Sequence, residues 1–191
     1  HDSVYGYAWN PGVSGTNVEI EKFVIKADNK TKIDEQLFNS NLKDGTIIEL
    51  DDGTYEVDKT ILIDKDVTIE GNGSTIKVTT DISGSGNGAN SAIEIEKGAN
   101  VVIKDITIDG NENVKHGINI FTSPSDEEQV KVELNGVTVR DCNGYGVVNN
   151  ASDLTVTDIE TSGNEWGGIN VDPKAGNNAS FTMNSGKITE S

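Results

Sequence analysis

The sequence predicts an all-β protein: a right-handed single-stranded parallel β-helix of about six coils with an N-terminal capping α-helix. Two observations lead to this prediction. Short runs rich in β-branched residues recur between Gly, Asn and Asp, and most of them alternate apolar and polar residues. The same order of three runs also repeats along the chain, with insertions between the runs. A solenoid tolerates such insertions, because its turns can vary while its strands stay stacked.

The repeat begins at residue 46, and each unit holds up to three predicted strands. They read TIIEL, TYEV, TILI; VTIEG, STIKV, SAIEI; VVIK, DITI, GINI; KVEL, VTV, YGVVN; LTV, DIE, GINV; and SFTM, KIT. Alternation in the first strands directs one apolar pair inward per coil: Ile48 and Leu50, Val67 and Ile69, Val101 and Ile103, Val132 and Leu134, Leu154 and Val156, Phe181 and Met183. Stacked about 4.8 Å apart, these pairs form continuous apolar columns.

Two points of this assignment stay open. The segments DVTIEGN (66–72) and DITIDGN (105–111) match closely yet fall at different places in the coils, so the register is not unique. A sandwich of antiparallel hairpins is the alternative fold, but it would show two-residue hairpin turns at regular intervals.

The residues before the first coil are predicted to cap it. In TKIDEQLFNSNLKDG (31–45), the apolar residues Ile33, Leu37, Phe38 and Leu42 share one helical face, and Gly45 can end the helix in a left-handed conformation. Residues 18–27 are expected to add an edge strand beside this helix. Residues 1–45 thus form the cap and residues 46–191 the β-helix, together one structural domain.

The helix followed by DGTIIELDDGTYEV, VTIEGNGSTIKV and AIEIEKGANVVIKDITIDGN resembles the pectin lyase-like right-handed β-helix superfamily, over residues 31 to about 190. The resemblance implies a right-handed β-helix. It also suggests a comparison with the pectate lyases of this superfamily, in which Arg or Lys abstracts a proton beside bound Ca²⁺. Here the single arginine, Arg140, is predicted to be salt-bridged in a turn with Asp109 and Asp141. On the third strands no adjacent-coil pair of outward carboxylates matches the glycoside hydrolases either, because Glu94 is followed by Asn119. A non-catalytic, adhesin-type member is therefore predicted.

Composition excludes several partners. The chain carries 32 acidic and 15 basic residues, a net charge of -17, which would repel nucleic acid and an anionic membrane surface. No apolar run approaches the roughly 20 residues that span a bilayer. The first residues, HDSVYGYAWN, lack signal-peptide features and are interpreted as a processed or recombinant boundary. Cys142 is a lone cysteine, predicted to be a small buried side chain.

The last residues, SGKITES, show no closing helix or polar coil. An uncovered coil would expose unpaired backbone groups and the end of the apolar columns. The C-terminal end is therefore expected to continue into, or pack on, another segment.

Function in such a fold is expected on the turns and on the outward side of the third strands. The turns at 109–116, 140–144 and 162–167 place His116, Tyr145 and Trp166 on three consecutive coils, where their rings could stack on sugars. The neighbouring outward column is predicted to be Leu62, Glu94, Asn119, Val148 and Asn170. The predicted ligand-binding residues are His116, Asn119, Tyr145, Glu165, Trp166 and Asn170.

The alternative interpretations of these residues are structural. Tyr145 and Trp166 could merely cover the stack, and His116 could be a surface turn residue, since no nucleophile with a positioning acid stands beside it. Asparagines in related turns, Asn72, Asn111, Asn143 and Asn164, are expected to hydrogen-bond each other and the turn backbone. No cofactor is required; Ca²⁺ is possible at Asp81, Asp109, Asn111 and Asn113.

Three functions follow from this pattern. The preferred hypothesis is an extracellular, secreted or cell-wall-associated bacterial module that binds a polysaccharide, or a glycan or protein of a host surface, as an adhesin would. A polysaccharide lyase or glycoside hydrolase and a structural spacer are the alternatives. At the level of stability, Ile118→Asp is expected to unfold its coil, whereas Asn119→Asp, on the outward side, is expected to cost little.

Overall fold

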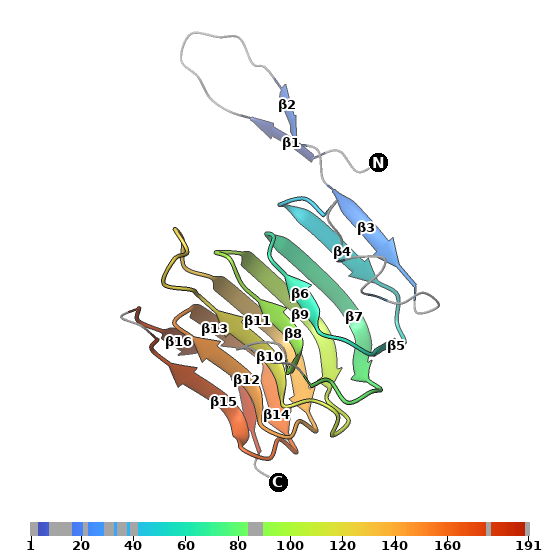
Figure 1. Ribbon diagram of the computed structural model, residues 1–191. Coiled ribbons are helices and arrows are strands. Elements are labelled where there is room, and N and C mark those ends of the chain that lie inside the picture. The colour runs from blue at the N-terminus through green and yellow to red at the C-terminus, as the bar shows by residue number, and fades with distance from the viewer. Residues whose placement is uncertain are drawn as a thin grey trace.

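The computed structural model shows an all-β protein with two parallel sheets (Figure 1). The structure describes residues 4–7, 17–20, 23–28, 33, 38, 42–83, 90–174 and 177–189. In the described residues the larger sheet holds ten strands, which are β3 (Val24–Ala27), β4 (Thr46–Leu50), β5 (Thr54–Val57), β7 (Val67–Val78), β9 (Asn100–Asp109), β11 (Lys131–Arg140), β13 (Asp153–Thr157), β14 (Ile159–Ser162), β16 (Ser180–Met183) and β17 (Gly186–Ile188). The smaller holds five: β6 (Ile61–Ile63), β8 (Ser91–Ile95), β10 (His116–Phe121), β12 (Tyr145–Asn150) and β15 (Gly167–Asp172).

The chain passes repeatedly from the larger sheet to the smaller and back. In both sheets the strands lie in the order of the sequence. Read from the last strand to the first, the larger sheet has the order β16-β13-β11-β9-β7-β4-β3 and the smaller sheet the order β15-β12-β10-β8-β6. Each strand therefore pairs in parallel with its counterpart from the next passage, as Figure 1 shows for the stacked arrows. This arrangement is compatible with a parallel β-solenoid.

The apolar columns that the alternation predicts are present. One runs through Val67, Val101, Val132, Leu154 and Phe181, and the other through Ile48, Ile69, Ile103, Leu134, Val156 and Met183. Most members are fully buried, but Phe181 and Met183 of β16 are 37% and 38% exposed. The core is therefore covered along its length, and its columns end at exposed side chains in the last strands.

The register of the first coil differs from the prediction by two residues. Thr46, not Ile48, pairs with Val67, and Ile48 pairs with Ile69. Thr46 is buried, and its hydroxyl donates a hydrogen bond to the carbonyl of Lys43 at 2.6 Å. A threonine with a local backbone acceptor can therefore occupy an inward position that the apolar pattern assigned to isoleucine.

Three predicted pairs of strands are single long strands. VTIEG and STIKV together form β7, VVIK and DITI form β9, and KVEL and VTV form β11. Asp105 and Gly136 take left-handed backbone angles, with φ of 47° and 65°, within β9 and β11. One left-handed residue redirects the strand while pairing continues on both sides, so the sequence shows two runs where the structure has one strand.

The predicted cap is not supported. Most of residues 31–41 lies outside the described part of the chain, in which no helix with defined bounds is present; Ile33, a single described residue in helical conformation, and Leu42 are buried. The expected edge strand over 18–27 is two strands, because β2 (Asn17–Ile20) pairs antiparallel with β1 (Val4–Tyr7), and only β3 pairs with β4. The alternation of apolar residues changes phase between Ile20 and Phe23, which fits two separate strands.

Candidate functional site

The three predicted aromatic residues meet at the start of consecutive strands of the smaller sheet. His116 begins β10, Tyr145 begins β12, and Trp166 directly precedes β15. The rings of His116 and Tyr145 stack with centroids 5.9 Å apart and planes inclined by 16°. Trp166 meets both rings edge-on, with centroids 6.0 Å from His116 and 5.7 Å from Tyr145. The rings form one cluster, not a ladder of three parallel plates.

Backbone hydrogen bonds between successive turns position this cluster. Trp166 N–H donates to the carbonyl of Gly144 at 3.0 Å, and Glu165 N–H donates to that of Cys142 at 2.9 Å. His116 N–H donates to Asn90 at 3.1 Å. The turns therefore stack like the strands they join, which holds the side chains in place.

A glycine makes room for the histidine ring. A Cβ atom at Gly144 would lie 2.6 Å from the carbonyl oxygen of Lys115 and 2.9 Å from Cε1 of His116. Any larger residue here would displace the ring. The packing of His116 against Tyr145 thus depends on the glycine of the intervening turn.

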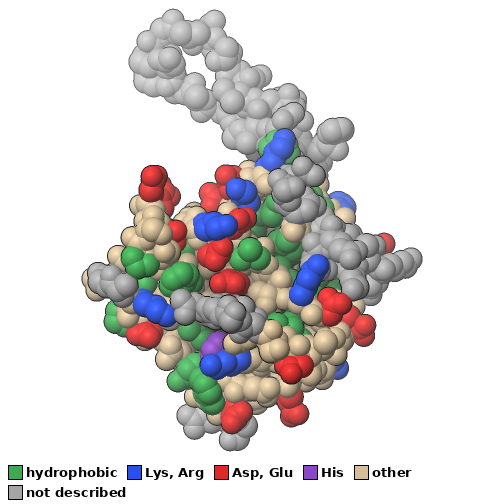
Figure 2. All heavy atoms as spheres, viewed as in Figure 1, with side chains coloured by type: hydrophobic (Ala, Val, Ile, Leu, Met, Phe, Trp, Pro, Cys, Tyr) green, Lys and Arg blue, Asp and Glu red, His purple; other side chains and the backbone are tan. Residues whose placement is uncertain are grey.

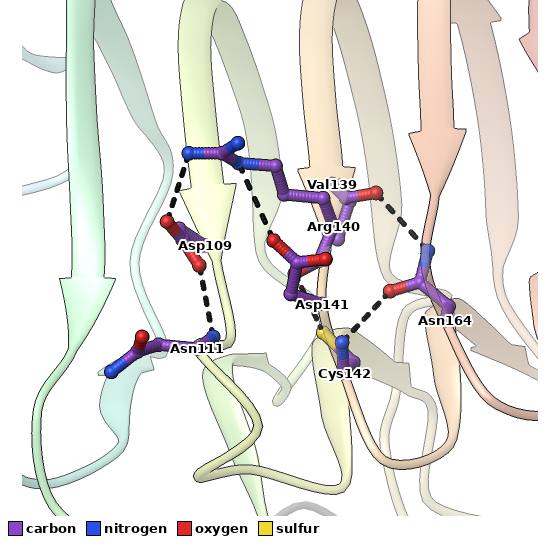
Figure 3. Close-up of polar contacts among 7 residues, drawn as sticks. All are labelled: Asp109, Asn111, Val139, Arg140, Asp141, Cys142 and Asn164. Atoms are coloured by element: carbon purple, nitrogen blue, oxygen red, sulfur yellow. Dashed lines mark hydrogen bonds and ion pairs between the residues drawn. The ribbon is translucent and has the colours of Figure 1, made fainter. Parts of the chain in front are cut away.

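Polar contacts beneath the turns have a structural role (Figure 3). The side chain of Asn164, 2% exposed, accepts from Cys142 N–H at 3.1 Å and donates to the carbonyl of Val139 at 3.1 Å. Asn72, Asn111 and Asn143 likewise donate to backbone carbonyls, those of Leu50, Val78 and Glu112. The predicted bonding to the backbone is confirmed, and the partner carbonyls belong to the neighbouring coil.

The arginine and the cysteine are also structural. Arg140 donates to Asp109 at 2.9 Å and lies 3.8 Å from Asp141, which confirms the predicted ion pairs (Figure 3). Burial raises the pKa of the Cys142 thiol to about 12, with Asp141 adding to the effect, so the side chain is a buried thiol.

Three of the four proposed Ca²⁺ ligands, Asp109, Asn111 and Asn113, hydrogen-bond to protein groups. The two carboxylate oxygens of Asp109 accept from Arg140 and from Asn111 N–H, while the amides of Asn111 and Asn113 point to the carbonyl of Val78. Within the described part of the chain, no three His, Cys, Asp or Glu side chains lie together as a potential metal centre.

His116 is neutral and has no free lone pair. Its Nδ1 accepts the backbone N–H of Tyr145 at 3.0 Å, so in the neutral ring the proton is on Nε2. Burial, and then the nearby ammonium of Lys115, lower its pKa from 6.5 to about 4. The side chain is therefore arranged to donate a hydrogen bond from Nε2, not to act as a general base.

The cluster borders a hollow of about 240 Å³. Its lining residues are Asn90, Lys115, His116, Asn119, Tyr145, Val148, Asn150, Trp166 and Asn170. Of the described residues that line the hollow, Lys115 carries a charged side chain. Its ammonium lies 4.7 Å from the centroid of the Trp166 ring. In Figure 2 the histidine, in purple, lies beside blue and green side chains. The hollow thus combines amides, rings and one cation.

The predicted outward column has the expected register, with Leu62, Glu94, Asn119, Val148 and Asn170 paired strand by strand. Its exposure differs from the expectation. Leu62 is 42% exposed, but Asn119 is 1% and Val148 6% exposed. Asn119 accepts a hydrogen bond from the amide of Asn150 at 3.2 Å, so it is a buried residue on the outward side.

Five of the six predicted ligand-binding residues line the hollow, and Glu165 does not. Four other residues that line the hollow were not among the predicted ligand-binding residues: Asn90, Lys115, Val148 and Asn150. Lys115 was detectable, because it directly precedes His116 in the same turn; Asn90 and Asn150 come close only through the stacking of coils.

Two other hollows lie beside the turn that precedes β11. One, of about 290 Å³, includes Asp126, Glu127 and Glu128, and the other, of about 440 Å³, includes Asp66, Glu128 and Lys131. Neither has an aromatic residue among its described lining. The aromatic hollow therefore offers the better surface for a sugar ring.

Comparisons with protein-family models, curated proteins and solved structures find no match to this chain. Among the described residues, no helix is long and apolar enough to cross a membrane. The functional argument therefore depends on the residues of the site itself.

Proposed function

We propose that this chain is a non-catalytic carbohydrate-binding module that recognises a glycan in the aromatic hollow. The observation that carries the proposal is the position of Trp166, 52% exposed at the edge of a hollow lined by amide side chains. An exposed ring complements the apolar face of a pyranose, and amides complement its hydroxyl groups. His116 supports recognition over catalysis, since its Nδ1 is engaged and its Nε2 is a donor.

At the level of fold, we propose a right-handed parallel β-helix of the pectin lyase-like type. The support is the ordered return of the chain to both sheets and the register of the apolar columns. Such a rigid stack suits a secreted or surface-displayed module that presents its turns to a glycan, as an adhesin does. The net charge of -17 favours a neutral or weakly charged partner.

A glycan array tests this function. The intact chain is applied with and without Ca²⁺, beside Trp166→Ala and a matched control, Phe181→Ala, in which a 37% exposed aromatic of the other sheet is truncated. We expect reproducible binding that is lost in Trp166→Ala and kept in Phe181→Ala. No binding to any glycan on the array, or equal binding by all three proteins, would contradict the proposal.

Enzymatic activity is tested on the same samples. Neutral glycans, pectate and alginate are incubated with the protein, and unsaturated or reducing ends are measured. The proposal expects none to appear above the buffer control, whereas turnover would replace it with a lyase or hydrolase function.

A further inference from the structure

Asn119 carries a buried hydrogen-bond donor without a partner. The residue lines the hollow and is 1% exposed. Its Oδ1 accepts from Asn150, but its Nδ2 has no hydrogen-bond partner among the residues that the structure describes. An unsatisfied buried N–H is costly, and a ligand that brings an acceptor to it recovers that cost. The hollow therefore favours a ligand with a hydrogen-bond acceptor that reaches its floor.

The surroundings of this donor specify the rest of the ligand group. Val148 follows Asn119 on the next strand of the column and is 6% exposed, so it offers a small apolar surface. Asn170 follows Val148 and offers an amide oxygen. Donor, apolar surface and acceptor thus follow one another along the column, beside the Trp166 ring.

An acetamido group carries the three matching features: a carbonyl oxygen, a methyl group and an N–H. Building on the proposed glycan-binding function, we propose that the hollow selects sugars that bear an acetamido group. In this assignment Asn119 Nδ2 donates to the acetamido carbonyl, Val148 packs on the methyl group, and Asn170 accepts the N–H. Trp166 packs against the face of the pyranose.

The lining favours this neutral group over a carboxylate. The cation of the hollow, Lys115, lies over the Trp166 ring, whereas the unpartnered donor at the floor is a neutral amide. A carboxylate at the floor would lose its hydration without gaining an ion pair there. A sugar with hydroxyl groups alone would reach Asn119 but leave Val148 without an apolar partner.

Three disaccharides with the same β-1,4-linked glucose skeleton test the proposal by calorimetry on the intact chain. They are N,N′-diacetylchitobiose, its deacetylated form chitobiose and cellobiose. We expect the acetylated sugar to bind at least about tenfold more tightly than the other two, because it alone supplies both an acceptor for Asn119 and a methyl group for Val148. This comparison uses the unaltered protein and so does not depend on the folding of a variant.

The variant Asn119→Leu removes the donor, and Asn143→Leu, in a turn outside the hollow, is its matched control. We expect the first to weaken N,N′-diacetylchitobiose binding about tenfold or more and the second to leave it unchanged. Thermal unfolding of each variant shows whether the fold is retained.

The outcomes separate the two proposals. Equal affinity for cellobiose and N,N′-diacetylchitobiose, lost in Trp166→Ala, would overturn the acetamido specificity and leave glycan binding in place. Preference for a uronic acid on the array would do the same. No binding to any disaccharide and none on the array would overturn both.

Discussion

At the scale of the residue, His116 shows how the stacking of parallel strands changes the chemistry of a side chain. Its backbone position in a turn suggests an ordinary surface histidine, yet the next coil provides the N–H of Tyr145, which fixes the tautomer. Packing against Tyr145 and Trp166 removes water from the ring. The sequence placed the three rings near one another, but their edge-on packing depends on the turn conformations that it does not reveal.

This environment predicts a specific pH dependence. Because the pKa of His116 falls from 6.5 in the unfolded chain to about 4 in the folded one, the unfolded chain binds more protons between these values. The free energy of unfolding should therefore decrease as the pH falls from about 6.5 to about 4. Urea unfolding of the wild type and of His116→Gln across this range measures the difference.

In the variant this component of the pH dependence should be missing, while the contributions of other groups remain. Two unfolding curves that differ by a constant amount at every pH would contradict the account. A resonance of His116 that titrates near 6.5 would do so as well.

At the scale of the element, the strands could be predicted better than the turns. The alternation of Val67, Ile69, Val101 and Ile103 predicts the inward face directly, because side chains of a strand have a period of two. The merging of predicted strands into β7, β9 and β11 could not be predicted, since a left-handed bend at Asp105 within a strand resembles a turn in the sequence.

The turns depend on asparagine side chains that bond to the neighbouring coil, and Asn164 is the most buried example. Asn164→Ala removes bonds to Cys142 N–H and to the carbonyl of Val139 and leaves both groups buried. We expect a loss of about 1–3 kcal/mol in the free energy of unfolding. Chemical denaturation measures this loss.

Asn143→Ala is the matched variant, because it loses one exposed bond to Glu112. It should cost less than about 1 kcal/mol. Equal costs for the two asparagines would show that the bonds of Asn164 do not hold the turns.

At the scale of the whole molecule, the columns explain which described side chains are buried and which stay exposed. Phe181 and Met183 end the two apolar columns, and Val171 and Ile188 lie in the last strands β15 and β17 beside Asn149 and Thr161; the four apolar side chains are 37–46% exposed. The expectation that another segment packs on the last strands stays a prediction. These four side chains form the surface that such a segment would cover. The N-terminal cap was harder to predict than the apolar columns, because a helical spacing of apolar residues alone does not establish a helix.

The columns predict how the stack responds to a buried charge. Ile118 is fully buried between Ile93 and Val147, so Ile118→Asp should cost several kcal/mol and abolish cooperative unfolding. Leu62→Asp, at a 42% exposed outward position, is the control and should cost less than about 1 kcal/mol. Thermal unfolding followed by circular dichroism compares them, and similar melting curves would contradict the assignment of faces.

The same comparison revises the expectation for Asn119→Asp. Because Asn119 is 1% exposed and bonded to Asn150, a carboxylate there would be buried on the outward side. The substitution should therefore lower the free energy of unfolding more than Leu62→Asp does. The alternation of apolar and polar residues alone could not predict that an outward residue is buried.

The central claim is that the hollow beside Trp166 binds a glycan, and the emission of that tryptophan tests it most directly. The chain has two tryptophans, so Trp9→Phe leaves Trp166 as the reporter. This protein is titrated with cellobiose, mannobiose and N,N′-diacetylchitobiose. The account predicts a saturable change in Trp166 emission with at least one sugar, because the sugar ring displaces water from the indole. Unchanged emission with all three, in a protein that remains folded, would contradict it.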